Sequence, residues 1–127
     1  MMPIKIEPKE NPIILGIDEN ELLEGYKETN MYHFMPEYLE KVYDGPNEEI
    51  LKSANSQLVE YKMNRDKYEY IGTHIYSEPS EKYFIEYYYG ENEELLVYLI
   101  ISPKNKKYYT SLQMVCVYQK EKDNNVN

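Results

Sequence analysis

Four blocks of alternating apolar and polar residues, joined by short turns, fill the second half of the chain. They span 68–77, 82–89, 95–102 and 108–119. Alternation with a period of two is typical of strands whose two faces differ. The turns are too short for crossover connections, which need about a dozen residues or more. We therefore predict a four-stranded antiparallel meander, with a bulge at Gly72 where the alternation shifts.

The third block is apolar on both of its faces. One face would carry Leu95, Val97, Leu99 and Ile101, and the other Leu96, Tyr98 and Ile100. A sheet with two apolar faces must be covered on both sides. Helices can cover one side. A curled sheet around a cavity, the N-terminal arm or a second copy of the chain could cover the other, and we favour a homodimer through the sheet.

The first half of the chain shows the periodicity of helices. A capping-box spacing after Asp18 predicts a short helix over 18–28. Prolines at first-turn positions predict further helices over 36–43 and 46–64. The third of these has a continuous apolar stripe, formed by Ile50, Leu51, Ala54, Leu58 and Tyr61.

With no linker and no repeat, 1–127 is predicted to be a single domain. It would comprise an extended arm (1–16), a helical part (17–65), the sheet (66–119) and a frayed tail (120–127). The predicted fold class is α+β, with about three N-terminal helices packed on one face of the four-stranded sheet. In element order this resembles the cone-shaped fold of the nuclear transport factor 2 family. The resemblance implies a pocket between sheet and helices, and often a dimer through the sheet. No residue motif accompanies it, so no functional residues are transferred.

Charge and targeting signals exclude several classes of protein. The chain carries 14 Lys and Arg against 23 Asp and Glu, a formal charge of −9. A negative surface repels a polyanion, so direct nucleic-acid binding is not expected. No signal peptide is visible, and the longest apolar run has seven residues, far from the roughly 20 that span a bilayer. We predict a cytoplasmic protein with no membrane association, or one in the host cytoplasm if a phage encodes it.

Residues suited to catalysis are few. The two histidines, His33 and His74, have no metal-ligand spacing around them, and no phosphate loop or nucleophile elbow occurs, so neither a metal nor a cofactor is predicted. His74 is the one weak catalytic candidate, as a general base beside Glu69 or Glu86. The alternative is a structural strand histidine with a hydroxyl partner, and the chain is predicted not to be an enzyme.

Tyrosine is the unusual residue of this chain, with 16 Tyr against two Phe and no Trp. Tyr combines an apolar ring with a polar tip and suits protein interfaces. The predicted partner-binding residues are Tyr68, Tyr70, Tyr83, Tyr87, Tyr88, Tyr89, Tyr108 and Tyr109. Two alternatives stay open: cross-strand Tyr pairs that stabilise the sheet, and a compositional bias of an AT-rich genome.

These observations predict a non-enzymatic interaction protein. It would be a small acidic factor of the inhibitor, immunity or counter-defence type that binds a protein target through a Tyr-rich, acid-rimmed surface. One alternative is a small-ligand-binding or minor enzymatic domain with a pocket lined by Tyr and aliphatic residues. A second alternative is a phage structural or assembly subunit.

Overall fold

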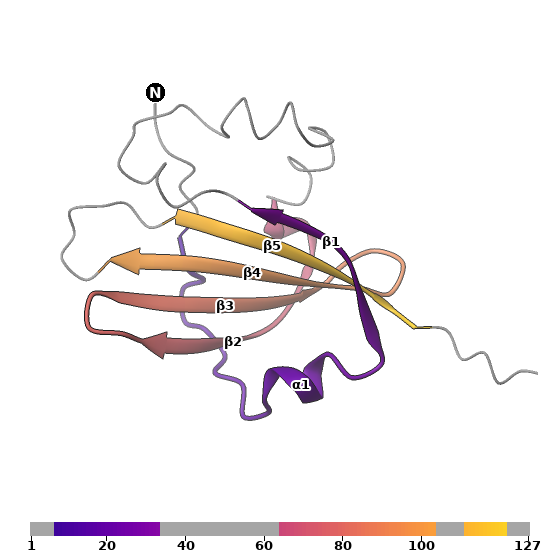
Figure 1. Ribbon diagram of the computed structural model, residues 1–127, viewed down its shortest axis with the longest axis horizontal. Coiled ribbons are helices and arrows are strands. Elements are labelled where there is room, and N and C mark those ends of the chain that lie inside the picture. The colour runs from indigo at the N-terminus through magenta and orange to yellow at the C-terminus, as the bar shows by residue number, and fades with distance from the viewer. Residues whose placement is uncertain (1–6, 34–63, 104–110, 122–127) are drawn as a thin grey trace, which may run out of the picture.

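A five-stranded antiparallel sheet forms the body of the protein (Figure 1). The computed structural model describes residues 7–33, 64–103 and 111–121. Neighbouring strands follow the order β1-β5-β4-β3-β2, and each neighbouring pair is antiparallel. The described part of the chain also holds the short helix α1 (Glu19–Leu22) and the 3-10 helix η2 (Arg65–Lys67). The strands are β1 (Tyr26–His33), β2 (Glu69–Ser77), β3 (Glu81–Tyr89), β4 (Glu94–Pro103) and β5 (Ser111–Lys120).

The predicted antiparallel meander is confirmed for the strands β2 to β5. Each strand pairs with the next one along the chain, and the observed bounds lie close to those that the alternation indicated. The bulge at Gly72 is also confirmed, because the β2–β3 register shifts between Tyr70 and Gly72. Residues 108–110 of the predicted fourth strand lie outside the described residues.

The predicted fold class, by contrast, is wrong. The sheet has five strands instead of four, and the described residues hold one four-residue α-helix and one 3-10 turn instead of three N-terminal helices. The helices predicted over 36–43 and 46–64 lie outside the described residues. The element order that resembled the nuclear transport factor 2 family is therefore not the order observed.

The error begins at the first predicted helix. Asp18 caps α1 as expected, accepting a hydrogen bond from the Glu21 amide at 3.0 Å. The helix then stops, because Gly25 adopts φ +83°, a left-handed conformation that turns the chain. The next residues form β1 and pair antiparallel with β5. Thr29, which directly follows the predicted helix, lies at a bulge in β1 and donates its hydroxyl to the Val117 carbonyl.

The described residues of the predicted arm contact the edge strand β2. Ile14 forms a parallel bridge with Thr73 of β2, held by hydrogen bonds from Leu15 N to Thr73 O and from Thr73 N to Ile13 O. In Figure 1 the arm passes behind the sheet, rounds the β2 edge and leads into α1 in front. The arm therefore shields the edge of β2 at Thr73 and connects the two faces of the sheet.

Both faces of the sheet carry buried residues. On the front face, which bears α1, the buried residues are Tyr87, Val97 and Cys116, with Leu15, Leu22 and Leu23 of the arm and α1 packed against them. The N-terminal arm was one of the three predicted covers, and it covers this part of the front face. The homodimer stays a prediction. The back-face core consists of Tyr68, Tyr88, Leu96, Tyr98, Ile100, Leu112, Val115 and Val117.

Candidate functional site

Three of the tyrosines predicted to contact a partner are core residues. Tyr87 and Tyr88 are 0% and 1% exposed, and Tyr68 is also buried. Tyr87 and Tyr88 are adjacent on β3, so their rings pack on opposite faces of the sheet. Burial raises the pKa of both hydroxyls well above the ordinary value for tyrosine. In this fold the three side chains are buried, and they are not part of the exposed surface described below.

Tyr88 instead forms the cross-strand pairs that were the alternative interpretation. Its ring centroid lies 5.3 Å from that of Tyr70, its direct neighbour on β2. It also lies 5.3 Å from the Tyr98 ring on β4, in an edge-to-face arrangement. Such pairs stabilise a sheet by about 0.2–1 kcal/mol each. These rings hold three strands together on the back face.

The remaining predicted tyrosines do not form one cluster. Tyr83 is half-buried near the start of β3 and donates its hydroxyl to Glu81 at 2.6 Å, whereas Tyr89 is 48% exposed at the other end of the strand. Tyr70 is half-buried, and its hydroxyl accepts a hydrogen bond from the Ile13 amide. Tyr108 and Tyr109 lie outside the described residues.

Part of the front face remains open beside Tyr83. Two adjacent rows of side chains cross the strands there, and all six side chains are at least partly exposed. Tyr76, which is not among the predicted partner-binding residues, is the most exposed of them at 49%. Its position opposite Tyr83 follows from the alternation once the β2–β3 register is known. We call these six residues the open face: Ile85, Leu99 and Met114 in one row, and Tyr76, Tyr83 and Ile101 in the other.

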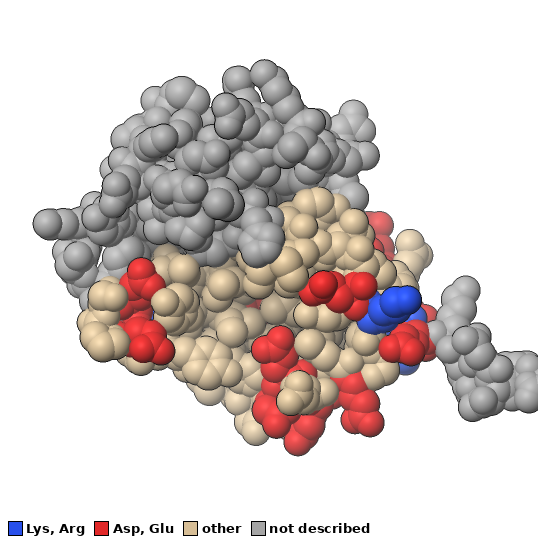
Figure 2. Space-filling model, in the orientation of Figure 1, with Lys and Arg blue, Asp and Glu red and all other residues tan. Residues whose placement is uncertain are grey.

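Carboxylates surround the open face and the covered residues beside it. Glu78 and Glu81 lie at the β2–β3 turn, Glu19 on α1 and Glu28 on β1. Figure 2 shows Asp and Glu atoms at the left end of the sheet, over α1 and near β1, with uncharged surface between them. We call these four residues the acidic rim.

The acidic rim changes the titration of nearby tyrosines. The pKa of Tyr83 is raised first by its hydrogen bond to Glu81 and then by desolvation and the charges of Glu81 and Glu78. The pKa of Tyr118 is raised to about 12, first by burial and then by Cys116 and the carboxylates of Glu28 and Glu19. Negative potential therefore extends over the front face from both sides.

Both ring nitrogens of His74 have hydrogen-bond partners within the protein. Its Nε2 lies 2.6 Å from the Ile17 carbonyl oxygen, which can only accept, so Nε2 carries a proton. Its Nδ1 lies 2.9 Å from the Tyr87 hydroxyl and accepts from it when the ring is neutral. Glu86 pairs opposite Thr73 on the back face, and Glu69 is exposed five residues earlier on β2. The predicted acid–base pair is therefore not formed, and His74 ties the arm to the sheet.

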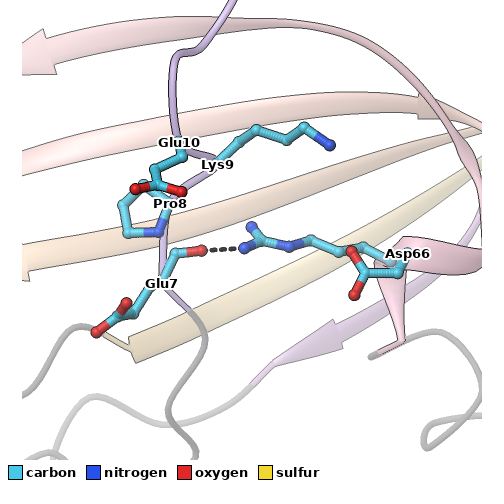
Figure 3. Close-up of a pocket in the computed structure, with 6 residues that line it drawn as sticks. Glu7, Pro8, Lys9, Glu10 and Asp66 are labelled. Carbon is cyan, nitrogen blue, oxygen red and sulfur yellow. Dashed lines mark hydrogen bonds between the residues drawn. The ribbon is translucent and has the colours of Figure 1, made fainter.

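Glu86 is the centre of a polar cluster that the sequence did not reveal. Its side chain is 0% exposed and forms an ion pair with Arg65. The Lys9 amide donates to the same carboxylate at 2.6 Å, and the Tyr88 hydroxyl at 3.0 Å. Arg65 also donates to the Glu7 carbonyl (Figure 3). Three segments far apart in sequence thus meet at one buried carboxylate, and no local spacing could have indicated it.

A hollow of about 580 Å³ lies beside this cluster. Its lining is mostly charged, so it differs from the Tyr- and aliphatic-lined pocket of the ligand-binding alternative. The side chains that line it come from the arm and from η2 (Figure 3). They are Glu7, Pro8, Lys9, Glu10, Arg65 and Asp66.

Cys116 is a buried thiol on the front-face side of β5. It is 3% exposed, and burial raises its pKa to about 11, so it is protonated at neutral pH and poorly nucleophilic. Over 7–33, 64–103 and 111–121, no group of three or more His, Cys, Asp or Glu residues could hold a metal ion. In the same ranges no helix has the length and apolar character needed to cross a membrane.

Comparison with known proteins finds no relative of this chain. No protein-family model matches the chain, and neither a curated protein nor a solved structure is significantly similar to it. The function is therefore argued from the open face, the contacts of His74 and the Glu86 cluster.

Proposed function

We propose that the protein is a non-enzymatic interaction protein, a small acidic factor of the inhibitor, immunity or counter-defence type, which binds a protein target through the open face. The observation that carries the proposal is the row of partly exposed apolar side chains Ile85, Leu99 and Met114 beside Tyr76 and Tyr83. Exposed apolar patches with polar surroundings are typical of protein–protein contacts, and Tyr is enriched among the residues that dominate binding energy.

The open face contrasts with the covered row next to it. Tyr87, Val97 and Cys116 lie under residues of the arm and α1 and are 0–5% exposed. The next row, which begins at Ile85, remains partly exposed although it belongs to the same sheet face. Apolar surface left in water costs about 25 cal/mol per Å² relative to burial. A partner that covers these rows would recover this free energy.

The polar groups of the described residues support the non-enzymatic part of the proposal. Both ring nitrogens of His74 have partners within the protein. The Glu86 carboxylate accepts from three donors, and Arg65 is shared between Glu86 and a backbone carbonyl. Groups held in this way connect segments of the chain, which is what a structural role requires.

The test is to capture partners from a lysate of the source organism with the tagged full-length chain. Tyr76→Ala/Tyr83→Ala should lose a stoichiometric partner that the wild type retains. Tyr89→Ala is the matched control, because Tyr89 and Tyr76 are 48% and 49% exposed but Tyr89 lies outside the open face. Circular dichroism should show that both variants fold. Equal capture by the double variant and the wild type, or no stoichiometric partner for the wild type, would contradict the proposal.

A further inference from the structure

The residues around the open face indicate the chemistry of the partner that it is proposed to bind, so this inference rests on the proposed function. The acidic rim borders the front face at the β2–β3 turn through Glu78 and Glu81 and on the opposite side through Glu19 and Glu28. The exposed Lys82 at the β2–β3 turn alternates with Tyr83 along β3 and therefore lies on the back face. The Lys and Arg atoms visible in Figure 2 gather mainly at the right-hand end, away from the β2–β3 turn.

The acidic rim argues against a second copy of this chain as the occupant. In a two-fold symmetric dimer each surface patch meets the same patch of the partner. The carboxylates of one copy would then face those of the other across a surface that excludes water. Like charges brought together in this way weaken association, and each chain already carries a formal charge of −9.

We infer that the open face binds a basic protein, whose contact surface has an apolar centre flanked by Lys and Arg side chains. The apolar centre would cover the rows of Ile85 and Tyr83. The cations would pair with the rim carboxylates at both sides. In Glu81 one carboxylate oxygen already accepts from Tyr83, which orients the group beside the apolar row.

Charge complementarity of this kind acts mainly on the rate of association and on the choice of partner. The attraction between exposed charges is screened by salt, since the screening length shortens from about 30 Å at 0.01 M to about 3 Å at 1 M. Binding through the open face should therefore weaken as salt is raised, whereas purely apolar contact would not weaken.

The experiment selects random dodecapeptides displayed on phage against the full-length protein. Peptides that combine Lys or Arg with apolar residues should be enriched, and Tyr76→Ala/Tyr83→Ala should abolish their binding. Glu78→Gln/Glu81→Gln should weaken it about two- to thirtyfold. Glu10→Gln/Asp66→Asn is the matched control, because it removes two exposed carboxylates beside the hollow of Figure 3, and it should leave binding unchanged.

The other outcomes separate this inference from the proposed function. Enriched peptides that are neutral or acidic, yet still need the open face, would overturn the basic partner and leave the proposed function standing. Absence of any peptide that depends on the open face would overturn both. Analytical ultracentrifugation completes the test: a wild-type dimer that Tyr76→Ala/Tyr83→Ala converts to a monomer would show that a second copy is the occupant and would overturn the basic partner.

Discussion

Replacement of Arg65 by Ala should destabilise the protein by about 3–5 kcal/mol. Removing one member of a buried ion pair leaves an uncompensated charge in the interior, and the loss of stability is usually of this size. Here the remaining charge is Glu86, which is 0% exposed, while the Arg65 side chain is 15% exposed. The Lys9 amide and the Tyr88 hydroxyl still donate hydrogen bonds to the Glu86 carboxylate in the variant. We therefore expect a loss of stability near the lower end of this range. The lost hydrogen bond to the Glu7 carbonyl adds about 0.5–1.5 kcal/mol.

A double-mutant cycle with Glu86→Gln isolates the ionic part of this cost. Gln has nearly the shape of Glu but carries no charge: its one oxygen can accept from the Lys9 amide, and its NH2 group can donate to the Tyr88 hydroxyl. Arg65→Ala/Glu86→Gln should therefore be about 1–3 kcal/mol more stable than Arg65→Ala alone. The lost bond to the Glu7 carbonyl is common to both variants and cancels in the comparison.

Urea unfolding followed by circular dichroism measures these differences by linear extrapolation. Domains of this size have unfolding free energies of about 5–15 kcal/mol, so the variants should retain a measurable transition. Lys82→Ala, at an exposed lysine, is the control and should change stability by less than about 0.5 kcal/mol. If Arg65→Ala does not fold, Arg65→Gln takes its place in the cycle, because it also removes the positive charge but keeps a longer polar side chain. Additive effects of the two substitutions, or a loss below about 1 kcal/mol for Arg65→Ala, would refute the reasoning.

Two further predictions concern the arm and alkaline pH. A Cβ at residue 72 would lie 2.5 Å from Leu15 Cδ2, so Gly72→Ala should displace the arm and lower the unfolding free energy by about 1–3 kcal/mol. A Cβ at residue 16 would meet nothing within 4 Å, so Gly16→Ala should lower it far less in the same urea assay. The folded-state pKa values of Cys116 and Tyr118 are raised to about 11 and about 12, from 9.0 and 10.0. Their contribution to stability is therefore complete below about pH 9 and is lost as the pH rises through 11 and 12. Unfolding free energies measured from pH 8 to 12 should fall accordingly, and a flat profile would contradict the assigned burial.

The local part of the fold could be predicted from the sequence. Side chains of a strand alternate between two faces, so the pattern of 82–89 was sufficient to place Phe84 and Tyr88 on one face and Ile85 and Tyr87 on the other. The bulge at Gly72 was visible as a break in that alternation. The N-cap at Asp18 also depends only on residues within one helical turn, and it is present in the structure.

For the candidate site, the sequence identified tyrosine as the residue type but not which tyrosines are exposed. Tyr83 and Tyr87 look equivalent in the alternation, since both lie on the front face of β3. Only the packing of the arm and α1 against Tyr87 makes one a core residue and leaves the other partly exposed. The place of Tyr76 directly opposite Tyr83 depends on the pairing of two strands, so the sequence alone did not select it as a partner-binding residue.

By itself, the sequence determined the strands β2 to β5, their antiparallel order and the two faces of the sheet, because these follow from short-range alternation and short turns. Only the tertiary structure decided that 26–33 is a strand, since that segment pairs with β5 more than 80 residues away. It likewise decided that Glu86 is buried as an ion pair with Arg65. Non-local pairing and charge burial depend on which segments meet in space, and the periodicity of any single segment does not contain that information.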